Sequence, residues 1–534
     1  MGRLTTNQAL AVAVVERLRA SGVGTFCVCP GGRNAPLVEA LDGLPAGLVS
    51  VLSFFDERSA AFFALGRARR DRAPVAVVTT SGTAAAELLP AMVEAHYSSA
   101  PLVAVTADRP RTYRGSGAPQ AIEQAGLFGV YAHRSVDVES AGELPENLVG
   151  AGPSHVNVCF AEPLLAGWIA APESEFADAP PPTVSGRSAA AVGAADDAVA
   201  EVAPFLASVR APLVIVGGLD SDDDRRRVVA LCQALGAPVM AEASSGLRSD
   251  PALRLLRTGD AAARHGFERG AFDSVIRVGD VPSWRTWRDL DVARPVPVLS
   301  VSRKPWRGLT RGTHVRVPDG VPLPFPASGN ANADREVGDL LEWDRRLAAA
   351  TDRLLASLPD SEPALVRRLS ESMPAGSFVY LGNSLPMREW NRFATFEERG
   401  FTIGESRGAN GIDGQVSTFL GWARPGVENW AVVGDLTALY DLSALWALRH
   451  LGGLRLRVVV INNGGGRIFQ RMFQNPRFQN RHATAFGAWA EMWGAEYHRQ
   501  LPAGPVGDAA VVELVPREDE TDAFWTRLDA EARR

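Results

Sequence analysis

The sequence has little cysteine, no long apolar run and no block of like charge. Only four of its 534 residues are cysteines, and their spacing fits no zinc pattern, so a disulfide framework and a zinc module are both excluded. No apolar run reaches the ~18 residues of a membrane-spanning helix, and the N-terminus lacks the apolar core of a signal peptide. A net charge of −6 without a basic run disfavours nucleic acid and membrane partners. We therefore expect a cytoplasmic protein.

Short continuous apolar runs recur along the chain with helix-length spacing. Continuous rather than alternating apolar strands are typical of parallel sheets covered on both faces. One further apolar stretch contains Cys27 and Cys29, which should face the same core. The predicted strands are 49–55, 75–78, 102–105, 156–160, 213–216, 275–278, 298–301, 378–381, 431–433 and 458–461.

Two Pro-rich and Ala/Gly-rich stretches, 172–196 and 318–334, read as linkers. They divide the chain into three parts, in line with a prior of ~150 residues per domain. We predict three doubly wound, parallel-sheet α/β domains over residues 1–180, 190–325 and 340–534.

The most informative spacing links Gly434-Asp435-Leu436 to the turn Asn462-Asn463-Gly464-Gly465, twenty-five residues further on. In a parallel sheet, both segments would end neighbouring strands, where ligands bind. A carboxylate, an amide oxygen and a carbonyl form a half-shell for a cation such as Mg²⁺, and the glycines allow a diphosphate to approach. Taken alone, the pair is also compatible with ordinary polar turns.

Other strand ends carry a carboxylate and arginines. Glu57 follows an apolar run, where burial would raise its pKa, although a solvated helix-start Glu is the plainer interpretation. Four further turns contain Arg33, Arg109, Arg388 and Arg407, and these favour multiply charged small anions. Tight turns and helix caps remain the alternative for each turn taken singly.

Taken together, these residues resemble the thiamin-diphosphate enzymes, which combine a GDG…NN metal–diphosphate motif with a catalytic Glu in another domain. Within that superfamily, the chain is most similar to the 2-succinyl-5-enolpyruvyl-6-hydroxy-3-cyclohexene-1-carboxylate (SEPHCHC) synthases of menaquinone biosynthesis. The segments that carry the resemblance are CPGGRNAPL (29–37), FDERSAAFFALG (55–66), TSGTAAAELLPAMVEA (80–95), TADRP (106–110), GAPQAI (117–122), GNSLPMR (382–388), SRGANGIDG (406–414), GDLTALYDLSAL (434–445) and NNGGGRIF (462–469).

The match has departures. Leu436 replaces the last Gly of the superfamily motif, as is typical of these synthases. Gly32 stands where the family usually has Ser, so a hydroxyl contact is absent there. Gly464 and Arg467 replace the common Asn and Gln beside the metal loop without removing a ligand.

The resemblance implies a pyrimidine-binding domain (1–180), a central domain (190–325) and a diphosphate-binding domain (340–534). It implies Mg²⁺ or Mn²⁺ held by Asp435, Asn463 and the Gly465 carbonyl, and Glu57 as the catalytic carboxyl on thiamin diphosphate. Further residues expected to bind the cofactor are Ser81, Gly82, Thr83, Asn383, Ile412, Gly434, Leu436, Thr437, Ile468 and Phe469.

The resemblance also implies the reaction: decarboxylation of 2-oxoglutarate and 1,4-addition of the succinyl-semialdehyde carbanion to isochorismate, giving SEPHCHC and CO₂. Active sites at the subunit interface of a homodimer or homotetramer are implied as well. The residues assigned to 2-oxoglutarate are Ser384, Arg388 and Arg407, and those assigned to isochorismate are Arg33, Arg109 and Gln120, with Arg285 as a further candidate contact.

Two other hypotheses remain open at this stage. One is another thiamin-diphosphate carboligase or decarboxylase, such as an acetohydroxyacid synthase-like enzyme, although the arginine-bearing loops disfavour small uncharged substrates. The other is a non-catalytic cofactor-binding regulator, which would have no use for Glu57.

Overall fold

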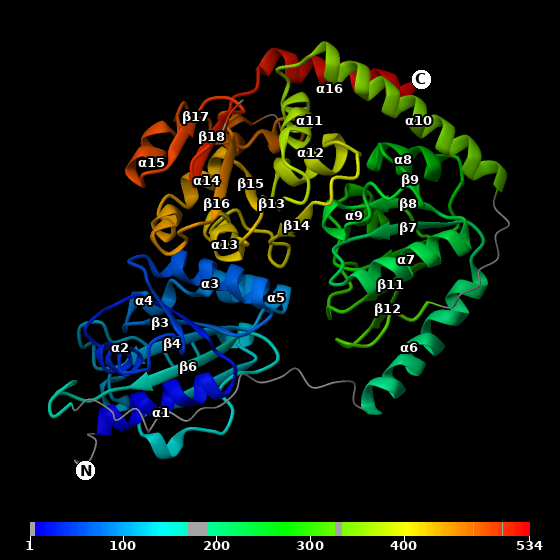
Figure 1. The fold of residues 1–534 in the computed structure, drawn as a ribbon. Helices are drawn as coiled ribbons and strands as arrows, with labels where there is room; N and C mark the ends of the chain where they lie inside the picture. The colour runs from blue at the N-terminus through cyan, green and yellow to red at the C-terminus, as the bar shows by residue number, and fades with distance from the viewer. Residues whose placement is uncertain (1–5, 169–188, 326–333, 474, 503, 505) are drawn as a thin grey trace.

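The computed structural model describes residues 6–168, 189–325 and 334–534, apart from 474, 503 and 505. It contains three six-stranded sheets in which every pair of neighbouring strands is parallel, and helices flank each sheet (Figure 1). The predicted fold class, three α/β units with parallel sheets, is confirmed. None of the described helices is long and apolar enough to cross a membrane.

The strands of each sheet come from one stretch of the chain. The first sheet has the order β2 (Ser50–Ser53), β1 (Thr25–Val28), β3 (Val75–Thr79), β4 (Leu102–Asp108), β6 (Ser154–Cys159) and β5 (Arg134–Val138). The second has the order β12 (Thr313–Arg316), β11 (Val298–Ser302), β10 (Ser274–Val278), β7 (Pro212–Val216), β8 (Pro238–Ala241) and β9 (Arg254–Leu255). The third has the order β14 (Thr402–Glu405), β13 (Phe378–Leu381), β15 (Glu428–Gly434), β16 (Arg455–Ile461), β18 (Ala509–Leu514) and β17 (Glu496–His498).

The helices are distributed in the same way, and the three groups are called the first, central and third units below. The first unit contains α1 (Thr6–Ala20), α2 (Ala35–Asp42), α3 (Glu57–Asp71), α4 (Thr83–Ala86) and α5 (Leu89–Ser98). The central unit contains α6 (Ala189–Ser208), α7 (Asp222–Leu235), α8 (Asp260–Glu268) and α9 (Arg285–Val292). The third contains α10 (Asp334–Ser357), α11 (Glu362–Ser372), α12 (Leu385–Phe393), α13 (Gln415–Trp422), α14 (Asp435–Tyr440), α15 (Gly487–Met492) and α16 (Glu518–Arg533).

All ten predicted strands are present. Nine of them are buried over most or all of their length, as their apolar composition predicts, whereas the edge strand β2 is largely exposed. Cys27 and Cys29 pack in the same buried cluster, as expected, and all four cysteines are free. The first linker prediction is wrong over residues 189–196, where an Ala-rich sequence forms the start of α6. The rest of that stretch that precedes residue 189, from 172, and residues 326–333 of the second stretch lie outside the described residues.

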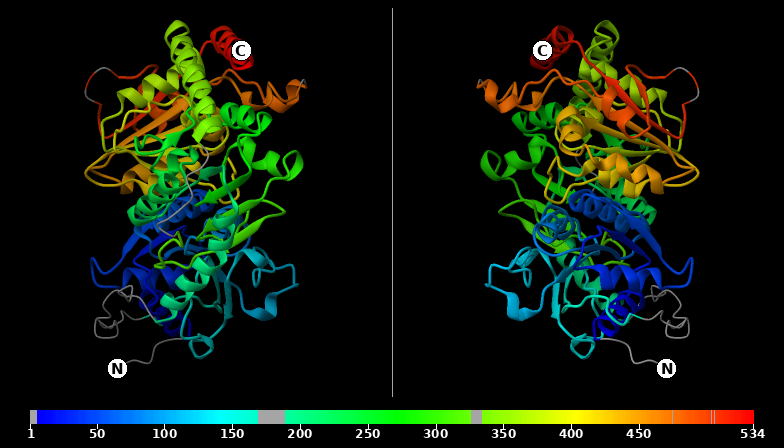
Figure 2. Two further views of the ribbon diagram at one scale, coloured as in Figure 1. Left: turned by 90° about the vertical axis from the view of Figure 1, so that its right-hand side faces the viewer. Right: turned by 90° about the vertical axis from the view of Figure 1, so that its left-hand side faces the viewer.

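The first and third units meet where α3 crosses α13, and the two units lie against each other in both side views (Figure 2). Small residues let these helices approach closely. A methyl group at Gly66 would overlap the carbonyl of Thr418, and one at Gly421 would overlap the carbonyl of Phe63. The crossing therefore depends on glycine at both positions, and it fixes α13 and the loop that precedes it.

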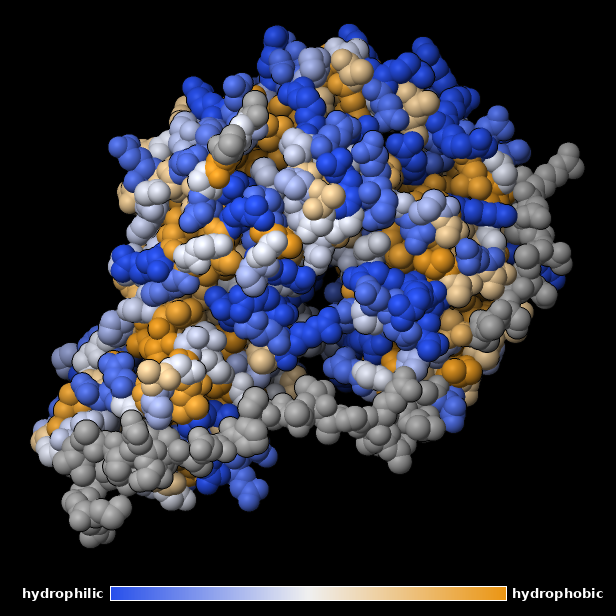
Figure 3. Space-filling view, in the orientation of Figure 1, coloured by the Kyte–Doolittle hydropathy of each residue, from blue (hydrophilic) through white to orange (hydrophobic). Residues whose placement is uncertain are grey.

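The central unit is fastened to the third unit through a buried guanidinium. Arg248 donates to the carbonyls of Asn391, Ala394 and Thr395 at 2.9, 2.7 and 2.8 Å, and its guanidinium stacks on Phe396. These carbonyls lie at the C-terminal end of α12, which has no further intrahelical donors for them. The contact holds in place the helix that carries Arg388. A hydrophilic band and a hollow mark the region where the three units meet (Figure 3).

Candidate functional site

The candidate site is a cavity of about 580 Å³ between the third and central units. Its size is that of a cofactor or small-ligand pocket. It gathers the carboxyl ends of β13 and β15, the turn after β16 and the start of α9, as expected for ligand sites of parallel sheets. The lining includes these predicted residues: Asn383, Ser384, Arg388, Arg407, Ile412, Gly434, Asp435, Leu436, Thr437, Asn463, Gly465, Ile468 and Phe469.

The aspartate of the predicted metal motif ends β15 and starts α14. Because β15 and β16 are parallel neighbours in register from Gly434 to Ile461, Asp435 lies beside the glycine-rich turn. Its carboxylate accepts backbone N–H bonds from Gly464 at 2.8 Å and Gly465 at 2.9 Å. Burial raises the pKa of Asp435, and these hydrogen bonds oppose the shift.

Two amide oxygens in the cavity have no hydrogen-bond partner. Asn383 donates through Nδ2 to the carbonyls of Ser406 and Gly411, both at 2.8 Å, which leaves its buried Oδ1 unpaired. The Oδ1 of Asn463 is also buried and unpaired. Buried acceptors without partners are rare in proteins and call for a ligand. Together with Asp435, they fit a hard cation and a polar cofactor.

The predicted metal ligands include only one charged side chain, unlike a metal site built from several His, Cys, Asp or Glu residues. No group of three or more His, Cys, Asp or Glu side chains in the described part of the chain is placed to hold a metal. The predicted ligands are one carboxylate, one amide oxygen and a backbone carbonyl. Because they do not form such a group, this finding does not test the predicted metal site. Gly465 has φ of +132°, a backbone conformation that favours glycine at this turn.

Three arginines line the same cavity. Arg388 lies on α12 and Arg407 on the loop before α13, and Arg288 of α9 comes from the central unit. Burial lowers the pKa of Arg388 to about 10, and the charges of Arg407 and Arg288 contribute to the shift. Guanidinium groups that repel one another in a cavity are suited to a ligand with more than one negative charge.

The central unit supplies wall residues that sequence analysis missed. Ser283, Trp287 and Arg288 line the cavity. Arg285, the sequence candidate from this region, lies outside it: its side chain is 63% exposed and lies 3.6 Å from Asp289. The two arginines stand one turn apart on the same side of α9, and Arg288, the one further into the helix, is the one that lines the cavity.

Two buried carboxyls lie near the arginines and were also missed. Glu242 follows β8 of the central unit and accepts a hydrogen bond from the backbone N–H of Ser283 at 2.6 Å. Glu405 ends β14 of the third unit. Burial raises both pKa values, that of Glu405 to about 7, and the charge of Arg407 opposes both shifts. Both follow strands, a position that the sequence pattern could have flagged.

The loop that carries Arg407 is held by the first unit. Glu94 of α5 is 4% exposed, and its carboxylate accepts the backbone N–H of Gly408 at 2.8 Å and of Ala409 at 2.6 Å. The two bonds compensate the buried charge and fix the start of the segment that also carries Ile412.

The remaining predicted residues lie on the first unit and form a second group. None of the described residues that line the cavity belongs to the first unit. The group lies at the carboxyl ends of the first sheet's strands and comprises Arg33, Glu57, Ser81, Gly82, Thr83, Arg109 and Gln120. One chain therefore contains both groups, but the structure does not bring them into one pocket.

Within this group, Glu57 and Ser81 have features of a ligand site. Glu57 begins α3 after the N-cap Asp56, and burial, with the charges of Asp56 and Glu87, raises its pKa. The Ser81 hydroxyl is buried and unpaired. Arg33 instead donates to the Phe160 carbonyl and pairs with Glu162 at 2.9 Å.

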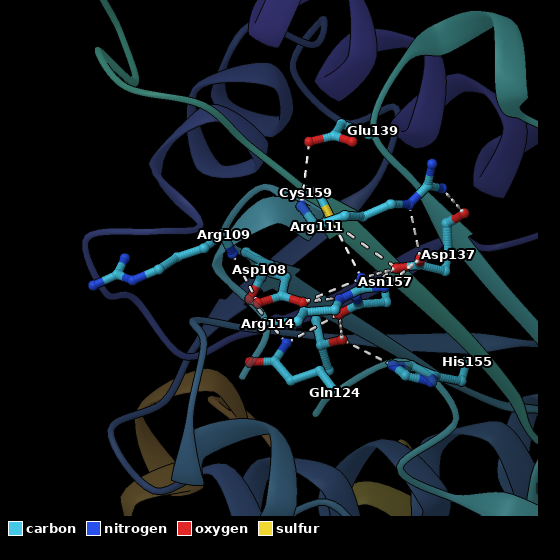
Figure 4. Close-up of polar contacts among 12 residues, drawn as sticks. Asp108, Arg109, Arg111, Arg114, Gln124, Asp137, Glu139, His155, Asn157 and Cys159 are labelled. Carbon is cyan, nitrogen blue, oxygen red and sulfur yellow. Dashed lines mark hydrogen bonds and ion pairs between the residues drawn. The ribbon is translucent and has the colours of Figure 1, made fainter. Parts of the chain in front are cut away.

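A buried polar network supports the second group (Figure 4). Gln124 accepts the backbone N–H of Gly82 at 2.8 Å and donates to Asn157 at 3.0 Å. Asn157 in turn donates to Asp108 and Asp137 at 3.0 and 2.8 Å. The network ties together the ends of β3, β4 and β6, while the Arg109 side chain extends away from it (Figure 4).

Comparison with known proteins agrees with this geometry. Residues 8–127 match the family model for the thiamine pyrophosphate enzyme, N-terminal TPP binding domain. The chain is 43% identical to the 2-succinyl-5-enolpyruvyl-6-hydroxy-3-cyclohexene-1-carboxylate synthase of Bdellovibrio bacteriovorus, over 98% of this chain and 99% of the relative. The synthase of the same name from Akkermansia muciniphila is 40% identical (95% and 96%), and that from Rubrobacter xylanophilus 36% (92% and 90%). The chain belongs to this synthase family.

The match to the family model also bears on how the predicted site residues are divided between the first and third units. The matched thiamine pyrophosphate domain covers the group on the first unit, while the GD…NN motif lies in the third unit, outside the matched range. The predicted cofactor residues of this family member are thus divided between its first and third units.

Proposed function

We propose that this chain catalyses the thiamin-diphosphate-dependent decarboxylation of 2-oxoglutarate and the addition of the resulting four-carbon unit to isochorismate, giving SEPHCHC in menaquinone biosynthesis. Full-length similarity to synthases of that name supports the proposal. The observation that carries it is one cavity lined both by residues with unpaired amide oxygens and by Arg388, Arg407 and Arg288. We propose a cytoplasmic location, in keeping with four free, buried thiols.

The third unit would hold the diphosphate end of the cofactor. Asp435, Asn463 and the Gly465 carbonyl would hold Mg²⁺ or Mn²⁺, which prefer such oxygen ligands. Ile412 offers apolar bulk in the cavity, and the side chains of Leu436, Ile468 and Phe469 add to the lining. When bound, thiamin diphosphate supplies a thiazolium that accepts the electron pair left by decarboxylation.

Other side chains would exchange the proton and bind the two substrates. Glu57, with its raised pKa, would exchange a proton at its carboxyl with the pyrimidine ring of the cofactor. Arg388, Arg407 and Ser384 would bind the carboxylates of 2-oxoglutarate. Arg33, Arg109 and Gln120 of the first unit would bind isochorismate, also a dicarboxylate.

A complete site would need two chains. Because the Glu57 group and the Asp435 cavity are separate within one chain, we propose that a homodimer is the smallest active unit, with Glu57 of one chain serving the cavity of the other. Closed two-fold symmetry then produces two identical sites.

The donor substrate tests the proposal. Charge-assisted hydrogen bonds are worth ~1.5–3 kcal/mol each, so two arginine contacts predict a preference of about a hundredfold or more for 2-oxoglutarate over pyruvate in kcat/KM. Arg407→Ala should reduce this preference while cofactor affinity is retained. Arg285→Ala, which lies on the same helix as Arg288 but outside the cavity, is the control and should leave it unchanged. Equal use of the two donors by the wild type would favour an acetohydroxyacid synthase-like carboligase instead.

A further inference from the structure

A buried carboxylate lies directly behind the asparagine of the glycine-rich turn. Glu362 is the first residue of α11 and is 3% exposed. Its backbone N–H donates to the Thr521 hydroxyl at 3.0 Å, which anchors the start of the helix to α16. Both carboxylate oxygens lie 3.0 Å from Nδ2 of Asn463. Two contacts from one carboxylate to one amide nitrogen leave that amide little freedom to rotate.

The chemistry of the contact decides which end of the amide faces the cavity. The Nδ2 of an asparagine only donates hydrogen bonds and Oδ1 only accepts them, and the two oxygens of Glu362 act as acceptors for Nδ2. Turning the amide over would place Oδ1 against those oxygens, with loss of both bonds. Nδ2 is therefore held toward Glu362, and Oδ1 is directed away from it.

The Oδ1 of Asn463, which is left unpaired by this arrangement, is the kind of oxygen that binds a divalent cation. Asn463 Oδ1 is buried, has no partner in the described residues and belongs to a residue that lines the cavity beside Asp435. A role for Glu362 in starting α11 alone, through its favourable place in the first turn, explains neither the paired contact nor the unpaired oxygen.

We propose that Glu362 is a positioning residue for the metal site: it orients the Asn463 amide so that Oδ1 is presented to the divalent cation. The inference rests on the proposed function, because it takes Asn463 as a metal ligand. Groups that orient metal ligands typically change metal affinity by ~10–100-fold when they are removed. Glu389 is the natural comparison: it is equally buried and its charge influences Glu362, but no hydrogen bond joins it to Asn463 in the described part of the chain.

Manganese binding tests this directly, without turnover. Free and bound Mn²⁺ are measured by electron paramagnetic resonance in the presence of thiamin diphosphate and without substrate. Glu362→Gln should bind Mn²⁺ about 10–100-fold more weakly, because the new amide can compete for Asn463 Oδ1. Glu389→Gln should bind it like the wild type. Wild-type affinity in Glu362→Gln would overturn the proposal.

A rescue experiment separates orientation from general damage. In the double variant Glu362→Gln/Asn463→Asp, the glutamine Nε2 can donate to one oxygen of the new carboxylate, which leaves the other oxygen for the cation. Mn²⁺ affinity should recover relative to Glu362→Gln, whereas Asn463→Asp alone, with two carboxylates in contact, should bind weakly. Absence of recovery in a double variant whose thermal unfolding in EDTA matches the wild type would also overturn the proposal.

A different variant tests the metal site of the proposed function independently of Glu362. Asp435→Ala should abolish Mn²⁺ binding if the metal site is where we place it. If the wild type and Asp435→Ala bind Mn²⁺ equally, the metal assignment itself is wrong. If only Glu362→Gln behaves like the wild type, the positioning role is wrong and the metal site stands.

Discussion

At the scale of single residues, burial decides which side chains have unusual acid–base behaviour. Glu57 is half-buried at the start of α3, and its pKa is raised by burial first and by the neighbouring Asp56 and Glu87 charges next. A carboxyl with a raised pKa can give and take a proton near neutral pH, which a fully solvated glutamate does poorly. The raised pKa is the property that the proposed reaction needs from this residue.

Replacing Glu57 should separate turnover from cofactor binding. Positioned acid–base groups contribute ~10²–10⁴-fold, so Glu57→Gln should lower turnover by at least about a hundredfold. Thiamin diphosphate should still bind, because the cavity at Asp435 is unchanged; fluorescence titration measures this. Glu87→Gln removes a nearby carboxylate of the same first unit and should retain most activity. Near-normal turnover in Glu57→Gln would mean that Glu57 only starts the helix.

His155 predicts a loss of stability in acid. It is fully buried, with Nε2 2.8 Å from the Thr106 hydroxyl, and burial lowers its pKa from 6.5 to about 4. Between these values the unfolded chain binds a proton that the folded chain does not, so stability falls as pH decreases from 6.5 to 4. The shift corresponds to about 3 kcal/mol.

His155→Leu should reduce this acid dependence of the free energy of unfolding, measured by urea denaturation at several pH values. Its absolute stability also changes, so the slope between pH 6.5 and 4 is the quantity compared. Identical slopes in the two proteins would show that His155 accepts a proton in the folded state as easily as in the unfolded state.

Sequence analysis identified strand-end residues well and long-range partners poorly. Asp435, Asn463 and the arginines stand next to apolar runs, so chain order alone places them at a sheet edge. Glu362 precedes its partner Asn463 by 101 residues and starts a helix. Nothing in its local sequence shows which side chain it meets, and pairings of this kind depend on tertiary packing.

At the scale of elements, the crossing of α3 and α13 is an extensive contact between the first and third units. Gly66 and Gly421 bring backbone against backbone there, and the Ser59 and Ser417 hydroxyls hydrogen-bond at 2.7 Å across the crossing. The conformational flexibility that glycine brings to a helix costs about 0.5–1 kcal/mol relative to alanine. Retaining it inside both helices indicates that close approach outweighs helix propensity.

Two glycine-to-alanine substitutions test this balance. Gly421→Ala places a methyl group on the Phe63 carbonyl and should destabilise the protein by more than ~1 kcal/mol, since backbone must move. Gly338→Ala, in the exposed part of α10 with open space around it, should stabilise by about 0.5–1 kcal/mol. Thermal unfolding of both variants measures the difference. A Gly421→Ala protein as stable as Gly338→Ala would show that the helices can separate freely.

Most of the strands inside the sheets were predicted, whereas most of the edge strands were not. The central strands β3, β7 and β13 are buried along their whole length and appear in the sequence as plain apolar runs. The edge strands β9, β12 and β17 are short and largely exposed, so polar side chains interrupt their apolar pattern. Their pairing is determined by the neighbouring strand rather than by their own composition.

At the scale of the whole molecule, the division of labour among the three units is the main result. The third unit contributes Asp435, Arg388 and Arg407 to the cavity lining, and the central unit contributes Ser283 and Arg288. The first unit holds the Arg407 loop through Glu94, yet its own predicted site residues are not among those that line the cavity. A single chain thus separates two groups of predicted site residues, which is the physical basis for proposing that two chains are needed.

Hybrid dimers provide the decisive measurement of that proposal. Glu57→Gln and Asp435→Ala are each expected to be nearly inactive as homodimers. If Glu57 serves the cavity of the partner chain, a hybrid of the two variants contains one site with both residues intact and one site with neither. Coexpression with two affinity tags and tandem purification isolates the hybrid, whose turnover per dimer should be about half that of the wild type, as two-fold symmetry requires.

If Glu57 and Asp435 instead act within the same chain, every site in the hybrid lacks one residue. The purified hybrid would then remain as inactive as its parents, and the two-chain arrangement would have to be abandoned.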